Sequence, residues 1–383
     1  MITAPKPRTP NPGTRTLHLS VLIPTLNRPG HLTRCLERLR AQTETAGAFE
    51  VIVIHDGPDP HGIRAAADFD TRQRFDLHAI QAPRLGNAHA KNLGLERARG
   101  TITVFLNDDV LPEPDFLETH LRAHTQRDAS SPALIVGQSP WCLAPSPTTF
   151  DRLLAETSMV FFYDRMLDSS GTPTQPPDHD WGYRHAWTLN LSAPTEAARA
   201  CGEFDAALAN CCFEDVEFAW RFTRKFNAPV LFRPEARADH DHPYTPADYL
   251  KREFRLGYSA FGFAIANPPC AQDLFRRDIT APHELAETQA HMNADEPRAA
   301  AWRARFAALA DPRPADAADL PSLACEKPET PSLAELYQQH LPLKRHEFRK
   351  GLLAAARGEL IEGLCPHPDS TATQGARLQP SSA

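Results

Sequence analysis

The chain has 383 residues, which allows a large core, and its 41 basic and 48 acidic residues give a net charge of −7. A general nucleic-acid binder would carry a basic surface, so this balance argues against that class. The eight cysteines form no Cys-x-x-Cys pair, the stretch 1–15 holds no apolar signal segment, and no run reaches the roughly 18–20 apolar residues that span a bilayer. We therefore expect reduced thiols and a soluble, cytoplasmic protein without a transmembrane span.

Apolar, β-branched runs alternate with helical patterns through the first third of the chain. They predict strands at 17–25, 49–54, 76–81 and 101–106, with helices at 29–42, 63–69 and 87–99 between them. Such alternation indicates βαβ units and a mostly parallel sheet, so we expect an α/β fold. In a sheet of this kind, ligands bind beyond the carboxyl ends of the strands.

The rest of the chain has a less regular pattern that becomes helical toward its end. We expect strands at 134–136 and 230–232, an aromatic segment at 161–163, and helices at 212–226, 249–264, 283–310 and 332–361, the last two joined by a Pro-rich stretch at 311–331. The expected division is a disordered tail at 1–16, an α/β domain at 17–267, a helical region at 268–363 and a disordered tail at 364–383. The C-terminal helices could bind a partner or form a homo-oligomer.

Adjacent carboxylates follow the fourth predicted strand. Asp108 and Asp109 come just after the run that ends at Leu106, where the sheet would hold them rigidly at its rim. Two such groups need a cation or hydrogen bonds to satisfy them. Mg²⁺ and Mn²⁺ prefer carboxylate and phosphate oxygens, so a divalent ion bridging to a diphosphate is one interpretation. An Asx-type turn that caps the next segment is the other.

Polar residues also follow the second predicted strand and open the helix before the fourth. Asp56 precedes Gly57, which is typical of a turn, and its carboxylate could instead accept a hydrogen bond from a nucleobase or ribose. Small residues at 84–94 let the backbone approach a ligand, and Arg84 and Lys91 could reach phosphates or the nucleoside.

Acids and histidines with two interpretations lie further along the chain. Glu214 and Asp215 open the predicted helix at 212–226, where they could complement the helix dipole or act on a substrate. His240 and His242 follow the strand at 230–232 within a polar run, either as loop residues or as metal ligands. We favour His240 as the ligand, and an imidazole would favour Mn²⁺ over Mg²⁺.

An aromatic-rich loop contains Trp181, Tyr183, His185 and Trp187. Sugars stack on aromatic faces, so Trp187 could contact an acceptor. The alternative is that these rings cover the core.

Six motifs follow one another in a characteristic order. They are Val-Leu-Ile-Pro-Thr-Leu-Asn-Arg at 21–28, Val-Ile-Val-Ile-His-Asp-Gly at 51–57, Ala-Lys-Asn-Leu-Gly at 90–94, Phe-Leu-Asn-Asp-Asp at 105–109, Cys-Gly-Glu-Phe-Asp at 201–205 and Phe-Glu-Asp-Val-Glu-Phe-Ala-Trp-Arg at 213–221. The first four closely resemble the N-terminal half of family 2 glycosyltransferases. The last two resemble that family's Gly-Gly-Phe-Asp and Glu-Asp segments. The resemblance covers roughly 18–245 and does not extend to the C-terminal third.

The resemblance implies the GT-A fold and inverting, metal-assisted transfer of a hexosyl-type sugar from a nucleotide diphosphate, with a UDP-sugar favoured and Mn²⁺ or Mg²⁺ as cofactor. Carried over by position, the expected nucleotide-binding residues are Pro24, Thr25, Asn27, Asp56, Arg84, Lys91 and Asp108. Asp109 and His240 would hold the metal, and Asp215 would be the general base. Glu214 would assist Asp215 and contact the acceptor.

Two positions depart from the family pattern. His55 replaces the first Asp of the usual Asp-Asp-Gly-Ser, and Asn107 replaces the first Asp of the metal motif, which removes one carboxylate. Neither change looks disabling.

Three other functions compete with glycosyl transfer. A sugar-nucleotidyltransferase needs a Gly-rich loop after the first strand, and here no glycine follows until Gly30. A non-catalytic nucleotide-sugar-binding module would lack the base or metal carboxylates, and a hydrolase using the His/Asp cluster alone would leave the strand-end motifs unexplained. The acceptor stays open among carbohydrate, lipid-linked and protein hydroxyls.

Overall fold

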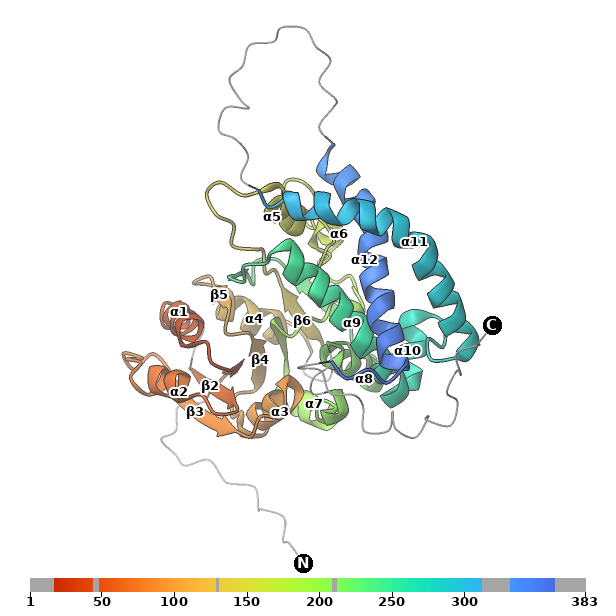
Figure 1. Cartoon of the computed structure of the whole chain (residues 1–383). Coiled ribbons are helices and arrows are strands. Elements are labelled where there is room, and N and C mark those ends of the chain that lie inside the picture. The colour runs from red at the N-terminus through yellow and green to blue at the C-terminus, as the bar shows by residue number, and fades with distance from the viewer. Residues whose placement is uncertain (1–16, 44–47, 129–130, 209–211, 312–330, 362–383) are drawn as a thin grey trace, which may run out of the picture.

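The computed structural model describes residues 17–43, 48–128, 131–208, 212–311 and 331–361 (Figure 1). The expected disordered tails at 1–16 and 364–383, and nearly all of the Pro-rich stretch at 311–331, lie outside the described residues.

A seven-stranded sheet with the order β3-β2-β1-β4-β7-β6-β8 lies at the centre of the molecule. The strands are β1 (Leu19–Thr25), β2 (Phe49–Asp56), β3 (Asp76–Ala82), β4 (Ile102–Leu106), β6 (Leu134–Gly137), β7 (Asn190–Pro194) and β8 (Val230–Arg233); a second sheet pairs β5 (Val110–Pro112) with β9 (Ala238–His240). Strands β1 to β4 are parallel, whereas β7 runs antiparallel to β4 and β6. The expected α/β fold with a mostly parallel sheet is therefore confirmed.

The helices cover both faces of this sheet and continue beyond it. They are α1 (Pro29–Arg40), α2 (Pro60–Ala67), α3 (Asn87–Arg97), α4 (Phe116–Thr125), α5 (Thr149–Glu156), α6 (Tyr163–Met166), α7 (Thr195–Cys201), α8 (Glu214–Phe226), α9 (Pro246–Ala266), α10 (Pro268–Phe275), α11 (Pro282–Ala308) and α12 (Leu333–Ala356), with short 3₁₀ turns at Tyr183–His185 and Ala206–Leu208. Among the described residues, no helix is both long and apolar enough to cross a membrane.

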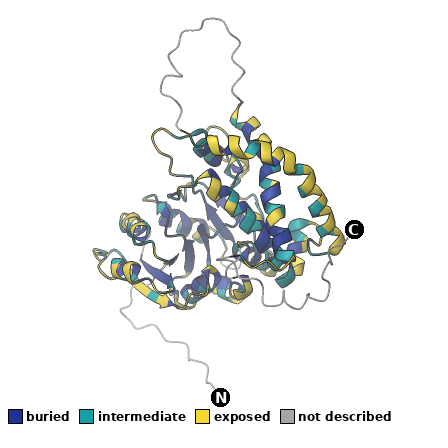
Figure 2. Cartoon of the chain, in the orientation of Figure 1, coloured by how far each residue is buried: buried dark blue, intermediate teal, exposed yellow. Residues whose placement is uncertain are grey.

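Alternation along the strands divides the core into two layers. Leu22 of β1 packs in one cluster with α3, α7 and α8, while its neighbours Val21 and Ile23 pack in the other cluster with α1, α2 and α4. Successive side chains of a strand point to opposite faces, which explains the division. Figure 2 shows the resulting buried sheet, in dark blue, between helices whose outer faces are exposed.

The C-terminal helices form a bundle that is docked onto the α/β domain. Helices α9 and α12 cross closely, because a Cβ on Gly257 would lie 1.8 Å from the Phe348 carbonyl oxygen and one on Gly351 would lie 2.0 Å from that of Phe254. The expected helices at 283–310 and 332–361 correspond to α11 and α12, so the helical C-terminal extension is confirmed. The domain boundary expected at 267 stays a prediction. Helix α9 lies before this boundary in the chain and packs against α12, which lies after it.

Candidate active site

The carboxyl ends of β1 and β4 bring polar residues together at one rim of the sheet. These strands are paired in parallel, with Leu22 opposite Phe105, so the residues that follow each strand lie side by side. Thr25, the last residue of β1, donates a hydrogen bond from its Oγ1 to Asp108 Oδ2 at 2.6 Å. The sequence predicted that both residues would lie in one pocket, and the structure brings them into direct contact.

A single arginine pairs with both rim aspartates. Arg28 Nη1 lies 2.9 Å from Asp108 Oδ1, and Arg28 Nη2 lies 2.8 Å from Asp109 Oδ2. Burial raises the pKa of Asp108 to about 6, against the opposing effects of Arg28 and of the Thr25 hydrogen bond. Burial acts in the same direction on Asp109, but its interactions with the imidazoles of His240 and His242 outweigh it and hold the pKa of Asp109 well below its usual range. Asp109 is therefore the carboxylate better kept in its ionised form.

The short second sheet places two histidines beside Asp109. Val110 of β5 pairs with His240 of β9, and the Asp241 N–H donates to the Asp109 carbonyl oxygen at 2.7 Å. His242 Nδ1 lies 3.0 Å from Asp109 Oδ2, and His240 Nε2 lies 3.7 Å from Asp109 Oδ1. The three side chains offer ligand atoms that all lie within 4.8 Å of one another.

This trio fits a divalent metal ion. Asp109 Oδ1 and His240 Nδ1 are buried, and neither has a hydrogen-bond partner among the described residues. A buried polar atom without a partner is costly, and a cation between the three side chains would offset that cost for the carboxylate. One carboxylate with two imidazoles suits Mn²⁺ better than Mg²⁺, which prefers oxygen ligands.

The indole of Trp141 supports one of the two histidines. Its ring stacks on His240 with 4.4 Å between ring centroids, and the backbone N–H of His240 donates to the Pro140 carbonyl oxygen at 2.7 Å. The sequence pattern did not mark Trp141, because it lies about a hundred residues before His240 in the chain. The stacking contact supports one face of the imidazole, and the backbone hydrogen bond holds β9 at this point.

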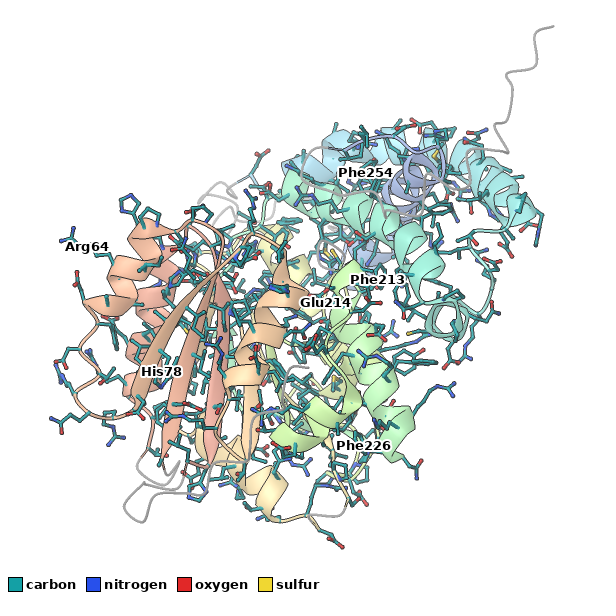
Figure 3. The ribbon with its side chains drawn as sticks, turned by 90° about the horizontal axis from the view of Figure 1, so that it is seen from below. Arg64, His78, Phe213, Glu214, Phe226 and Phe254 are labelled. Atoms are coloured by element: carbon teal, nitrogen blue, oxygen red, sulfur yellow. The ribbon has the colours of Figure 1, made fainter. Side chains whose placement is uncertain are left out.

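Glu214 and Asp215 begin α8, and their surroundings differ (Figure 3 labels Glu214). Glu214 Oε1 accepts hydrogen bonds from Lys91 Nζ and Asn87 Nδ2 of α3, both at 3.0 Å. Lys91 is 1% exposed and also donates to Thr188 Oγ1 at 2.6 Å. The expected acceptor contact of Glu214 and nucleotide contact of Lys91 thus remain predictions, since the two side chains face each other in a buried ion pair.

Asp215 is half-buried, and the hydrogen bonds that it accepts from described residues come from backbone N–H groups. Its Oδ2 lies 3.4 Å from the Thr188 backbone nitrogen, and its Oδ1 accepts from the Val216 N–H at 3.0 Å. Burial raises the pKa of Asp215 to about 6, and the charge of Glu214 adds to this effect while Lys91 opposes it. A carboxylate with a pKa near neutrality can both accept and release a proton.

The remaining nucleotide-site candidates line the loops beside β1 and β2. Asp56 accepts the backbone N–H groups of Leu85 and Gly86 at 3.0 and 3.1 Å. Gly86 has a φ of 95°, a conformation that favours glycine and that turns its N–H toward Asp56. Arg84 is exposed and lies against Gly57. Asp56 thus ties the loop before α3 to the end of β2, and its contact with a nucleobase stays a prediction.

Pro24 is the penultimate residue of β1, and Asn27 lies in the loop between β1 and α1. Pro24 is half-buried, while Asn27 is exposed and has a left-handed backbone with φ of 55°. The Asn27 backbone N–H donates to Asp59, whose carboxylate also contacts His55 Nδ1 at 2.9 Å. His55, which stands where the family usually has an aspartate, is fully buried, and its contact with Asp59 is internal.

Trp187 belongs to an aromatic group between β7 and α6. Its ring lies edge-on to those of Phe161, Tyr163 and His185, with centroid distances of 5.2, 5.3 and 5.7 Å. It is half-buried, so it covers the core while keeping part of its surface in solvent. Its role toward an acceptor stays a prediction.

Comparison with known proteins places these features in context. Residues 20–187 match the family described as Glycosyl transferase family 2. The chain is 28% identical over 220 residues to validoxylamine A glucosyltransferase of Streptomyces hygroscopicus subsp. jinggangensis, covering 53% of this chain and 50% of that protein. It is 24% identical over 272 residues to pre-mycofactocin glycosyltransferase of Mycobacterium tuberculosis, covering 70% and 51%. The chain thus spans about half the length of these curated relatives.

A solved structure resembles the whole described architecture. The mannosyltransferase PcManGT from Pyrobaculum calidifontis, solved in complex with GDP-Man and Mn²⁺, superposes with a TM-score of 0.50 at 18% sequence identity, covering 91% of this chain and 90% of that one. This likeness bears on the fold, and it confirms the GT-A architecture that the sequence motifs implied.

Proposed function

We propose that this chain, whose residues 20–187 match Glycosyl transferase family 2, transfers a sugar from a nucleoside diphosphate donor to an acceptor hydroxyl with inversion at the sugar carbon. The observation that carries the proposal is the convergence of Asp109, His240 and His242 at the rim where β4 ends. A divalent ion held by these three side chains would neutralise the charge that develops on the departing diphosphate.

Asp215 is the base in this proposal. The acceptor oxygen forms a bond to the donor's sugar carbon as the bond from that carbon to the diphosphate breaks, and the acceptor's proton passes to the Asp215 carboxylate. The pKa of about 6 suits this role, because the group is ionised at neutral pH and still basic enough to take a proton. Glu214 is a positioning residue, since its pair with Lys91 fixes the start of α8 against α3.

The nucleotide would lie between the β1–α1 loop and the loop before α3. Thr25, Asn27 and Asp56 border this region, and Arg84 is exposed beside it. The family resemblance favours a UDP-sugar as the donor, and GDP-Man is the ligand of the structurally similar mannosyltransferase. Both nucleotides therefore belong in the first binding screen.

Nucleotide binding should depend on Mn²⁺ and on Asp109. Calorimetry with UDP, GDP and their sugars, in Mn²⁺ and in EDTA, measures this directly. We expect Asp109→Ala to lower the affinity in Mn²⁺ to the level seen in EDTA, because it removes the carboxylate shared by both histidines. Asp239→Ala is the matched control, since Asp239 lies next to His240 but pairs with Arg237 at 2.9 Å. Undiminished affinity of Asp109→Ala in Mn²⁺ would remove the metal from the proposal.

The sugar-nucleotidyltransferase and binding-module alternatives predict different products. The former would release inorganic pyrophosphate from a nucleoside triphosphate and a sugar phosphate, and the latter would leave a bound donor intact. Conversion of a nucleotide sugar to free nucleoside diphosphate would exclude both.

A further inference from the structure

Arg28 occupies an unusual place in the candidate site. It is the N-cap residue of α1, and its side chain is 33% exposed although both of its partners are buried. The guanidinium bridges Asp108 and Asp109 and also approaches His242 Nδ1 at 3.5 Å. A planar guanidinium can contact two carboxylates at once, which a lysine ammonium does less well.

Arg28 already contacts the carboxylate that a metal ion in this site would use. Asp109 Oδ2 lies 2.8 Å from Arg28 Nη2 and 3.0 Å from His242 Nδ1. A divalent ion held by Asp109, His240 and His242 would therefore place two cations against one carboxylate. Like charges close together repel strongly in a partly buried site, so an ion bound to Asp109 would weaken the contact between Arg28 and the same carboxylate.

We propose, on the premise of the function above, that Arg28 is an exchangeable counter-ion. It neutralises Asp108 and Asp109 in the metal-free protein and leaves Asp109 when a divalent cation binds there. Two buried carboxylates without a cation would repel each other, so Arg28 keeps the empty site folded. Its guanidinium remains next to Asp108 after the exchange, because Asp108 is not one of the three grouped ligands.

The exchange predicts opposite effects on metal affinity and on stability. If the pair with Arg28 leaves only about a tenth of the molecules ready to take up the ion, it weakens the apparent Mn²⁺ affinity by about tenfold. Arg28→Gln should therefore bind Mn²⁺ on the order of tenfold more tightly than the wild type, by the same relation. The metal-free variant should melt at a lower temperature than the wild type, and Mn²⁺ should raise its melting temperature by more.

The test is calorimetry of Mn²⁺ binding to the full chain without nucleotide, together with melting curves in EDTA and in Mn²⁺. Arg34→Gln is the matched control. Arg34 lies on the same helix and pairs with Asp241 at 2.6 Å, so this variant removes an equal charge nearby without touching Asp108 or Asp109. Tighter Mn²⁺ binding by Arg28→Gln than by Arg34→Gln supports the exchange. Equal affinities in the two variants, or weaker binding by Arg28→Gln, would overturn it.

Arg28→Lys provides a second variant in case Arg28→Gln does not fold. It keeps the charge but not the two-carboxylate bridge, so we expect it to bind Mn²⁺ more tightly than the wild type; affinity equal to that of the wild type would contradict the bridge. Failure of the proposed function is seen separately, as a wild-type protein that binds no nucleotide sugar in saturating Mn²⁺. That result does not depend on how Mn²⁺ affinity changes when Arg28 is replaced.

Discussion

At the scale of single residues, the two carboxylates that begin α8 have different roles because they have different partners. Glu214 is held by Lys91 and Asn87, whereas Asp215 accepts only backbone N–H groups at 3.0 and 3.4 Å. Burial, aided by the charge of Glu214, raises the pKa of Asp215 to about 6. The carboxylate free of a charged hydrogen-bond donor is the one suited to take a proton.

The pH dependence of the reaction should report this pKa. At saturating donor and Mn²⁺, kcat/KM for the acceptor should rise with pH through about 6 and then level off, because only ionised Asp215 accepts the proton. Glu214→Gln removes a charge that raises the pKa of Asp215, so the rising part of the pH profile should move to lower pH. If the pH profile of Glu214→Gln rises at the same pH as that of the wild type, or if the rate is independent of pH between about 5 and 7, Asp215 is not the group that titrates.

The sequence predicted the candidate site where local position was sufficient. Asp108, Asp109 and Asp215 were singled out because each lies at a strand end or helix start. The bridge by Arg28 and the pairing of Lys91 with Glu214 could not be inferred, because each joins residues at least 80 positions apart. The sequence favoured His240 over His242 as the metal ligand, and the structure places His242 closer to Asp109, at 3.0 against 3.7 Å.

At the scale of elements, the crossing of α9 and α12 depends on two glycines. A Cβ at Gly351 would lie 2.0 Å from the Phe254 carbonyl oxygen and 2.8 Å from the Tyr258 nitrogen, both of them backbone atoms that cannot rotate away. Gly351→Ala should therefore force the helices apart and lower the free energy of unfolding by about 1–3 kcal/mol.

Urea unfolding measures this loss, with Gly30→Ala in α1 as the control. A Cβ at Gly30 would meet nothing nearer than Arg34 Nη1 at 3.9 Å, so that variant should be at least as stable as the wild type. Equal stability of the two variants would mean that α9 and α12 do not cross as closely as described.

Elements were predictable where their pattern was long and regular. The four parallel strands of the N-terminal half lie where their apolar runs predicted them. The helix expected at 249–264 is α9. It starts earlier, at Pro246, because the Thr245 side chain caps it by accepting the Asp248 N–H. Strands β5 and β9 were missed, since three residues each are too few for an alternating pattern. These two short strands bring His240 to Asp109.

At the scale of the whole molecule, one apolar cluster joins the C-terminal helices to the α/β domain. Phe306 of α11 is fully buried, with ring centroids 5.6 Å from Phe150 of α5 and 5.8 Å from Tyr249 of α9. Such a shared cluster should make the two regions unfold together, although the sequence suggested a boundary at 267.

Phe306→Ala should lower the stability of the entire chain by about 3–5 kcal/mol, because it empties a fully packed site. Calorimetric melting is the measurement, and we expect one transition at a lower temperature. Leu360→Ala is the control, since Leu360 is 80% exposed and its loss should be nearly neutral. A second, unshifted transition in Phe306→Ala would show that the α/β domain is stable without the docked helices.

The most direct test of the proposed chemistry is single-turnover donor consumption by Asp215→Asn beside donor binding by the same protein. Asn keeps the shape and hydrogen bonds of Asp215 but cannot take the acceptor's proton, so the rate should fall by about 10²–10⁴-fold. Donor affinity in Mn²⁺ should stay close to that of the wild type, because Asp109, His240 and His242 are unchanged. An Asp215→Asn protein that turns over its donor within about threefold of the wild-type rate, far less than loss of a general base costs, would contradict the account.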